Sequence, residues 1–319
     1  MSTKGLMKPA SLQDSFAGIS RLKLYLALSR TPHVLLDMAT PAFGALLWLG
    51  AIPSLKVTLL GLITAFAGYT AVYALNDILD HRVDRVQYQE DGFSDLKNYL
   101  DALLVRHPIA QGLLTLRESL TWVAAWSMVA LIGAYALNPV CALIFIAGSL
   151  LEASYCLLWE VSSFRTVISG VVKTSGGIAA VFAVDPSPSP FFLAALFLWI
   201  FLWEVGGQNI PADWADIERD SRSQAKTIPV LCGPARANAL SLYCLVLVVL
   251  INLFLFRLTP GGFEIYDAGI CFFAGVYLLI LPAYRLLKSR NRLDALKLFN
   301  RACYYPLTLF VVVGIRSII

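Results

Sequence analysis

Long apolar stretches alternate with short polar segments along almost the whole chain. A helix needs about 20 apolar residues to cross the hydrocarbon core of a bilayer, and nine stretches of roughly that length follow one another in the sequence. They cover residues 33–51, 54–75, 115–137, 139–158, 164–184, 190–207, 237–257, 265–287 and 302–318. The pattern therefore predicts an all-α integral membrane protein, with nine transmembrane helices in one domain of residues 33–319.

The composition agrees with this prediction. The 319 residues are 58% hydrophobic and 14% charged, whereas soluble domains contain about 45–50% apolar and 25% charged residues. Residues 1–32 lack the apolar core and small-residue cleavage site of a signal peptide, so we expect a cytoplasmic lead-in that ends in an amphipathic segment. The net charge of +4 is modest and gives no indication of nucleic-acid binding.

The basic residues predict the orientation in the membrane, because Lys and Arg accumulate in the cytoplasmic loops of membrane proteins. Of the 25 Lys and Arg residues, only Lys56, Arg257 and Arg316 fall on the side opposite the N-terminus, while Lys173 falls inside a span. The N-terminus and the long polar loops are therefore expected on the cytoplasmic side.

Two long loops, residues 76–114 and 208–236, hold nearly all the polar chemistry. In each loop Asn or Asp recurs every three or four positions, so a helix would place three side chains on one face. The two sets are Asn76, Asp80 and Asp84, and Asp213, Asp216 and Asp220. Because like charges at this spacing repel, each set needs a cation, and oxygen ligands favour Mg²⁺ shared with a substrate phosphate. The sequence thus predicts a diphosphate substrate.

Simple solvation of helix ends, redox chemistry and zinc binding fit the polar residues less well. Charged residues that only solvate helix ends would not recur periodically at two equivalent places. The six Cys residues are far apart, without a CxxC pair, and the three His residues are isolated from one another. The sequence therefore predicts neither a redox site nor a zinc site.

Three segments carry a resemblance to a known family. The stretch NDILDHRVD from Asn76 resembles the NDxxDxxxD signature of the UbiA superfamily of intramembrane aromatic and lipid prenyltransferases. The segment DWADIERDSRSQAKTIP from Asp213 resembles the second aspartate motif of that family. The segment RHPIAQGLLT from Arg106 is similar to the Arg-Pro-Ile-x-x-Gly stretch that follows the first motif. The resemblance spans most of the chain, because the motifs follow the second and sixth predicted spans, as in that family.

The resemblance implies a bundle of nine helices around a central cavity that opens to lipid. It implies Mg²⁺-dependent transfer of an isoprenyl group from a prenyl diphosphate to an aromatic or other lipid-precursor acceptor, through an allylic carbocation. Two Mg²⁺ ions would hold the diphosphate between the motifs. The sequence identifies neither the acceptor nor the length of the prenyl chain.

The resemblance also implies roles for individual residues. Arg85, Arg106 and Lys226 would contact the diphosphate. Asp77 would support the fold, and Asn209 is a weaker candidate ligand. The metal ligands would be Asn76, Asp80, Asp84, Asp213, Asp216 and Asp220, and the catalytic aspartates among them would be Asp80, Asp84, Asp216 and Asp220.

Two positions depart from the family pattern or stand outside it. The first basic residue after Tyr155 is Arg165, later than in many members, so either Arg165 binds the diphosphate from the next helix or the diphosphate is held differently. Tyr155 itself would face the acceptor or the carbocation. Lys173 places a charge inside a span, which is costly, so it either contacts diphosphate or acceptor in the cavity or extends to the cytoplasmic surface.

The link between the first motif and Arg106, residues 86–105, is longer than usual for the family. Its apolar residues recur at helical spacing: Phe93, Leu96, Leu100, Leu103 and Leu104. They predict an amphipathic helix at the membrane surface that recognises the acceptor or caps the site. The alternative is a surface insertion without a function.

Three other functions share parts of this pattern. A terpene cyclase on the same scaffold would ionise the same diphosphate without an external acceptor. A transporter also has many membrane helices, although its binding site usually lies near the midplane of the membrane. A CDP-alcohol phosphotransferase uses aspartates and metal in a helical bundle, but its signature occurs once and has a different spacing.

Overall fold

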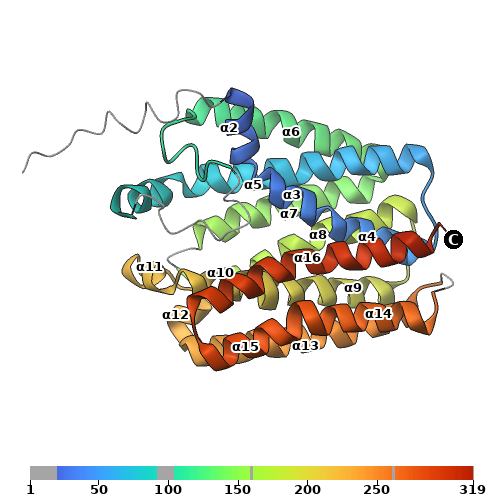
Figure 1. The fold of residues 1–319 in the computed structure, drawn as a ribbon. Helices are drawn as coiled ribbons and strands as arrows, with labels where there is room; N and C mark the ends of the chain where they lie inside the picture. Colours follow the sequence, from blue (N-terminus) through green and yellow to red (C-terminus); the bar gives the residue numbers. More distant parts are fainter. Residues whose placement is uncertain (1–19, 92–103, 159–160, 261–262, 319) are drawn as a thin grey trace, which may run out of the picture.

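The computed structural model describes residues 20–91, 104–158, 161–260 and 263–318. Every regular element in these residues is a helix, and the long helices run side by side in one bundle (Figure 1). The first half contains α2 (Arg21–Leu28), α3 (Thr31–Asp37), α4 (Ala39–Leu49), α5 (Leu55–Asp91), α6 (Leu116–Leu137), α7 (Pro139–Leu157) and α8 (Arg165–Val184). The second half contains α9 (Pro190–Trp203), η2 (Glu204–Asn209), α10 (Ile210–Ala215), α11 (Ile217–Arg222), α12 (Ile228–Cys232), α13 (Pro234–Leu258), α14 (Ile265–Gly275), η3 (Val276–Ile280), α15 (Leu281–Ser289) and α16 (Arg292–Arg316).

The predicted membrane spans can be compared with these helices. Among the described residues, 8 helical segments are long and apolar enough to cross a membrane, and they match the second to ninth predicted spans. The first predicted span, residues 33–51, forms two shorter helices, α3 and α4, that meet at Met38. Met38 keeps helical backbone angles, with φ −59° and ψ −20°. The all-α, multi-pass membrane fold is confirmed, whereas the count of nine spans stays a prediction.

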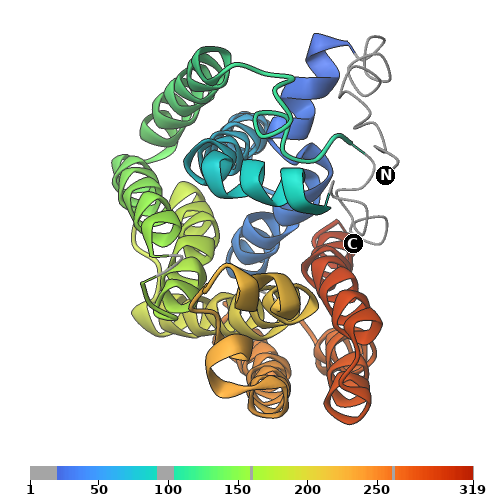
Figure 2. The ribbon, with the colours of Figure 1, turned by 90° about the vertical axis from the view of Figure 1, so that its left-hand side faces the viewer.

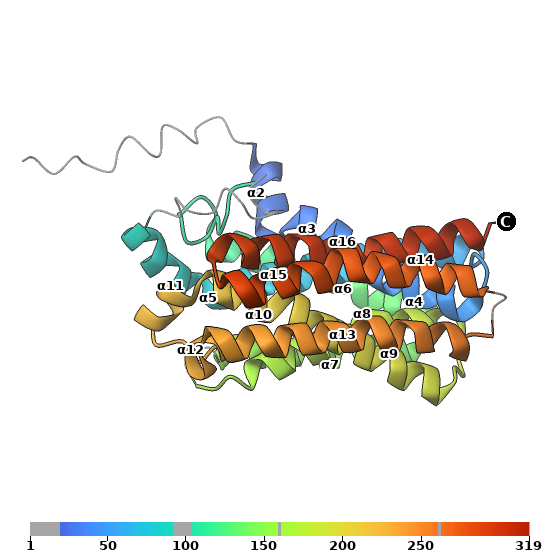
Figure 3. The same ribbon diagram turned by 60° about the horizontal axis from the view of Figure 1, so that its bottom comes forward.

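Both motif-bearing segments are more helical than the predicted loops. α5 does not end near residue 75 but continues to Asp91, so the first motif lies on the same helix as the second span. The sixth span continues from Pro190 to Ala215 through η2 and α10. The end of α5 and helices α10 to α12 lie at the same end of the bundle (Figures 1 and 3). Figure 2 views this end and shows the teal end of α5 above the gold segment that contains α10 and α11.

The helix that carries the second motif contains a π-helical turn, η2, directly before Pro211. Proline has no N–H and its ring clashes with the carbonyl four residues earlier, and a wider turn relieves this clash. The same arrangement recurs where η3 precedes Pro282. Gly206 lets η2 approach α13 closely, since a Cβ atom at this position would lie 2.7 Å from the Cβ atom of Cys244. Both the proline that follows η2 and the close packing of Gly206 on α13 therefore favour a π-helical turn at this position.

The main hydrophobic core lies between α4, α9, α13 and α16, with Trp199, Trp203 and Tyr305 among its largest fully buried side chains. At the other side of the bundle α2 packs on α5 and α6, where Tyr25 stacks on Trp122 with ring centroids 4.7 Å apart. This part of the predicted lead-in is therefore docked on the bundle. Residues 1–19, and residues 92–103 of the predicted surface helix, lie outside the described residues.

Candidate functional site

A cavity of about 770 Å³ lies inside the bundle. Its walls come from α4, α5, α7, α8, η2 and α16, and most of the lining side chains are apolar. Asn76 of the first motif and Asn209, which precedes the second, both line it. The cavity therefore starts beside the motifs and extends into the apolar interior, as the resemblance implied for a central cavity.

The first motif lies along α5. Nδ2 of Asn76 donates a hydrogen bond to Oε1 of Glu152 at 3.0 Å, and Oδ1 of Asn76 accepts one from Arg30 at 3.5 Å. Asp80 and Asp84 follow Asn76 at intervals of four residues, about 6 Å each along the axis of a helix. The helix thus carries the motif from the cavity toward the end of the bundle, with the spacing that the sequence predicted.

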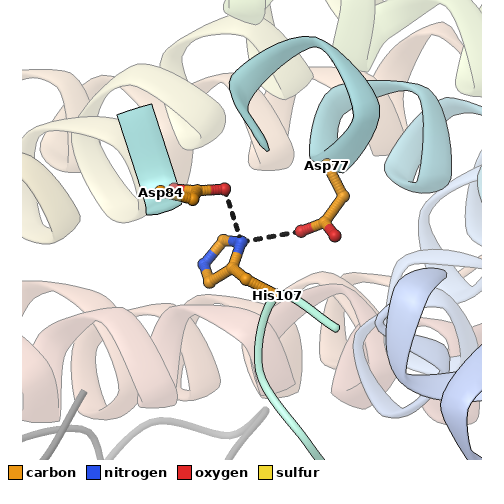
Figure 4. A group of neighbouring side chains, drawn as sticks. All are labelled: Asp77, Asp84 and His107. Carbon is orange, nitrogen blue, oxygen red and sulfur yellow. Dashed lines mark hydrogen bonds and ion pairs between the residues drawn. The ribbon is translucent and has the colours of Figure 1, made fainter. Parts of the chain in front are cut away.

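Asp84 has a partner that the sequence analysis missed. Nδ1 of His107 hydrogen-bonds Oδ1 of Asp77 at 2.7 Å and lies 2.7 Å from Oδ2 of Asp84, and all three side chains are buried (Figure 4). Burial opposes a charge on His107, but the carboxylates of Asp84 and Asp77 outweigh it and raise the pKa of His107. His107 therefore ties the loop after α5 back onto the first motif through Asp77 and Asp84, whereas a purely supporting role for Asp77 stays a prediction.

The second motif bends where a single helix was predicted. Asp213 lies on α10, whereas Asp216 stands between α10 and α11 with non-helical angles (φ −106°, ψ 11°), and Asp220 lies on α11. Asp216 pairs with Arg219 and lies 3.9 Å from Arg292 on α16. The expected stacking on one continuous helix is therefore wrong. The three carboxylates nevertheless remain close enough to influence one another electrostatically.

Asp220 shows that the second motif fits a cation. Its side chain is 1% exposed, and neither carboxylate oxygen has a hydrogen-bond partner among the described residues. Burial, followed by the charges of Asp213 and Asp216, raises the pKa of Asp220 to about 8. An ionised carboxylate without a partner is costly to bury, and a divalent cation with oxygen ligands would remove that cost. The donor set therefore fits Mg²⁺.

Arg165 connects the two motifs. Its guanidinium donates a hydrogen bond to the hydroxyl of Tyr155 and lies 4.3 Å from the centroid of that ring. It is buried and lies close enough to Asp80 and to Asp213 to interact electrostatically with both. Arg165 is thus the basic residue beside Tyr155, in the position that the sequence left open, and Tyr155 lines the cavity.

Three other basic residues were predicted to contact the diphosphate, and they do not all lie near the aspartate motifs. Arg85 and Lys226 are exposed, and neither is among the described residues that line the cavity. Nε of Arg106 lies 2.9 Å from Nε2 of His107, so Arg106 lies next to the first motif. The structure therefore brings Arg165 and Arg106 to the motifs and leaves Arg85 and Lys226 on the surface.

Lys173 faces the cavity and does not extend to the membrane surface. Its ammonium pairs with Asp37 and lies 3.8 Å from Glu204, and its side chain is 10% exposed. The sequence analysis missed Asp37, Glu152 and Glu204, which are buried acids inside apolar stretches. The signal that selected Lys173, a charge within a span, would also have selected these three residues.

Comparison with known proteins gives the family. Residues 38–305 match the UbiA prenyltransferase family. The chain is 23% identical over 215 residues to a digeranylgeranylglyceryl phosphate synthase from Thermococcus kodakarensis, covering 67% of this chain and 71% of that protein. It is 24% identical over 302 residues to a 4-hydroxybenzoate octaprenyltransferase from Shewanella woodyi, covering 94% and 98%.

The fold is also similar to that of a solved structure, a UbiA homologue from Archaeoglobus fulgidus bound to DMAPP and Mg²⁺. The TM-score is 0.64 at 17% sequence identity, and the match covers 91% of this chain and 99% of the homologue. Because the family match includes both aspartate motifs and most of the helices around the cavity, the chain belongs to the UbiA prenyltransferase family.

Proposed function

We propose that this protein transfers an isoprenyl group from a prenyl diphosphate to an acceptor within the membrane, using Mg²⁺ held by the two aspartate motifs. The observation that best supports this function is the position of Arg165, a buried cation close to both Asp80 and Asp213. A guanidinium in this position can bind phosphate oxygens through charge-assisted hydrogen bonds and so supports a diphosphate between the acidic motifs. Family membership favours this function over a transporter or a CDP-alcohol phosphotransferase.

The donor would bind with its diphosphate at the motif end and its hydrocarbon chain in the cavity. Arg165 would donate hydrogen bonds to the phosphate oxygens. Mg²⁺ bound by Asn76, Asp80, Asp84, Asp213, Asp216 and Asp220, as two ions, would neutralise charge that develops as the allylic C–O bond breaks. The electron pair of that bond leaves with the diphosphate, and the allylic carbon becomes positive.

The cavity would protect this carbocation until the acceptor reacts. Its apolar walls limit access of water, and the ring of Tyr155, beside Arg165, can stabilise a cation in the cavity through its π face. A nucleophilic atom of the acceptor then gives an electron pair to the allylic carbon, and the acceptor loses a proton. The distribution of Lys and Arg supports a cytoplasmic location for the motif end and the N-terminus.

The proposal is tested with purified protein in nanodiscs, supplied with Mg²⁺, prenyl diphosphates of several lengths and a panel of hydroxyl-bearing acceptors. We expect prenylated product from the wild type and at least a 100-fold lower rate from Asp80→Asn and Asp220→Asn. Glu218→Gln, on the exposed side of the second motif, is the matched control and should retain the rate. Full activity of both aspartate variants, or of the wild type in excess EDTA, would overturn the proposal. Cyclised product without any acceptor would instead indicate a terpene cyclase.

A further inference from the structure

An asparagine precedes the aspartates of each motif, and a buried glutamate holds each asparagine. Nδ2 of Asn76 donates a hydrogen bond to Oε1 of Glu152 on α7 at 3.0 Å. Nδ2 of Asn209 donates one to Oε1 of Glu204 at 2.7 Å. Both glutamates are buried and line the cavity. The same pairing of asparagine with glutamate therefore recurs at the two motifs.

Each asparagine lies one helical turn from the nearest aspartate of its motif. Asp80 follows Asn76 by four residues on α5, and Asp213 on α10 follows Asn209 by four residues. Residues four apart in a helix share a face and lie about 6 Å apart along its axis. The two carboxamides, which line the cavity, thus lie next to aspartates that are expected to bind the metal.

The carboxamide nitrogen of Asn76 points toward α7. It donates to Glu152 and also lies 3.5 Å from Sγ of Cys156, a weaker acceptor on the same helix. Oδ1 of Asn76 must then point away from α7, because the nitrogen and oxygen lie on opposite sides of the planar group. Oδ1 accepts one long hydrogen bond, from Arg30 at 3.5 Å, and its second lone pair can bind a cation.

Asn209 is held in a similar way. Its Nδ2 donates to Glu204 and to Oγ of Ser169, the latter at 2.9 Å, and Oγ of Ser169 donates to the same glutamate oxygen at 3.1 Å. The other oxygen of Glu204 lies 3.8 Å from the ammonium of Lys173. Among the described residues, no group donates to Oδ1 of Asn209. This oxygen is therefore left for a ligand in the cavity.

A glutamate partner decides which end of a carboxamide faces the cavity. An unrestrained carboxamide can turn by about 180° and present either its oxygen or its NH₂ group, and only the oxygen binds a cation. A turned carboxamide would place Oδ1 against a glutamate oxygen, where two acceptors face each other and no hydrogen bond forms. Glu152 and Glu204 thus favour the orientation that turns the oxygen away from them.

Helix packing alone does not account for these glutamates, because a carboxyl group inside a membrane helix is costly. Three cations lie close enough to Glu152 to offset part of this cost electrostatically: Arg30, Lys173 and Arg165. Yet the one hydrogen bond that Glu152 accepts from the described residues comes from Asn76. An ionised carboxylate only accepts hydrogen bonds, whereas glutamine both donates and accepts. Glutamate is therefore the side chain that specifies the orientation of the carboxamide.

We propose that Glu152 and Glu204 are positioning residues of the Mg²⁺ site: each holds the amide of one asparagine, so that the carbonyl oxygens of Asn76 and Asn209 face the metal. The inference rests on the proposed function, because it concerns the ions which that function needs. It adds two acids on membrane-spanning helices, outside both aspartate motifs, to the residues that determine metal affinity. It also gives Asn209 the same role as Asn76.

The test measures metal binding directly. Protein in nanodiscs is dialysed against geranyl thiodiphosphate, a non-hydrolysable donor analogue, and Mn²⁺, which accepts the same oxygen ligands as Mg²⁺ and is counted by EPR. Glu152→Leu and Glu204→Leu should each raise the dissociation constant of Mn²⁺ about tenfold or more, as is typical for groups that orient metal ligands. Glu152→Gln and Glu204→Gln should raise it at most about threefold, because glutamine can still accept the amide hydrogen.

A double-mutant cycle shows whether each glutamate acts through its asparagine. Asn76→Ala removes the metal-binding oxygen, so adding Glu152→Leu should weaken Mn²⁺ binding no further. Asn209→Ala should likewise cancel the effect of Glu204→Leu. A glutamate that only supports the fold would weaken binding by the same factor with and without its asparagine.

The controls separate metal binding from folding. Glu218→Leu, the same substitution at an exposed position on α11, should keep the dissociation constant of the wild type. Thermal unfolding in EDTA shows whether each variant is folded. If a leucine variant does not fold, Glu152→Ala or Glu204→Ala takes its place, with the same expected loss of Mn²⁺ binding.

The outcomes are distinct. Unchanged Mn²⁺ binding in the folded leucine or alanine variants would overturn the positioning role, and so would an equal loss in the glutamine variants or a further loss in the double variants. Prenyl transfer by the wild type would stand in each of these cases. A wild type that retains no Mn²⁺ with the donor analogue and prenylates no acceptor would overturn the proposed function, and the positioning role with it.

Discussion

The guanidinium of Arg165 lies against the ring and hydroxyl of Tyr155, although ten residues and a turn between two helices separate them in the sequence. This contact fixes a buried cation between the two aspartate motifs. A chain without a basic residue shortly after Tyr155 can therefore still place one beside that tyrosine.

Replacing Arg165 should therefore affect the donor more than the acceptor. We expect Arg165→Gln to lower kcat/KM for the prenyl diphosphate by about 10- to 100-fold, because hydrogen bonds from a charged donor contribute about 1.5–3 kcal/mol. Steady-state kinetics with varied donor measures this. Arg117→Gln, at an exposed position on α6, should leave the kinetics unchanged. A similar loss in both variants would argue against a specific role for Arg165.

Mg²⁺ should stabilise the protein more at high pH than at low pH. The pKa of Asp220 rises from 3.8 to about 8 through burial and through Asp213 and Asp216, so ionisation of Asp220 destabilises the metal-free fold as the pH increases from about 4 to 8. Mg²⁺ would replace the proton and remove this penalty.

Thermal unfolding with and without Mg²⁺ measures this effect. The increase in Tm on adding Mg²⁺ should be larger at pH 8.5 than at pH 6, and Asp220→Asn should reduce that difference. An equal increase at both pH values in the wild type would show that Asp220 is not a ligand of the ion.

His107 should stabilise the first motif in a pH-dependent way. Asp84 and Asp77 raise the pKa of His107 above 6.5, so its contribution is fully present below pH 6.5 and is lost as the pH rises through the higher value in the folded protein. Removing one partner of a buried ion pair costs about 3–5 kcal/mol.

We therefore expect His107→Gln to lower Tm strongly at pH 6 and less at pH 9. His81→Gln, on the same motif but with its ring bonded to the carbonyl of Ile78, is the comparison. A loss in Tm that does not change with pH would indicate that His107 contributes by packing alone.

Gly206 should tolerate no side chain. A Cβ atom there would lie 2.7 Å from Cβ of Cys244 and 3.0 Å from the carbonyl of Ser241, and overpacking of this kind costs about 1–3 kcal/mol. Gly206→Ala should lower Tm in detergent. Gly269→Ala, where nothing lies within 4 Å, should preserve or slightly increase it because alanine favours helix. Unchanged stability of Gly206→Ala would mean that η2 can move away from α13.

The sequence predicted the membrane fold and the two motifs because these depend on local patterns. Apolar length determines whether a segment can cross a bilayer, and the spacing of Asn76, Asp80 and Asp84 matches the repeat of the helix that carries them. The bend at Asp216 was not predictable in this way, because tertiary contacts with Arg292 on α16 accompany it.

The contacts among the charged residues inside the bundle were harder to predict than the motifs. Asp37, Lys173 and Glu204 come from three separate elements, and a single sequence contains no information that pairs them. His107 was missed for the same reason, since residues 85–106 separate it from Asp84. The family pattern also favoured Arg85 and Lys226, whose side chains lie on the surface in this fold.

The π-helical turn before Pro211 has a consequence for communication along its helix. Residues five apart in an α-helix point about 140° away from each other, given 3.6 residues per turn, but the wider turn of η2 aligns Glu204 with Asn209 so that their side chains touch at 2.7 Å. The contact joins Glu204, which lines the cavity next to Lys173, to Asn209 at the start of the second aspartate motif. Removing the Glu204 carboxylate should therefore also take away a hydrogen-bond acceptor from Asn209, so a change within the membrane interior would reach the acidic end of the bundle through one side-chain contact.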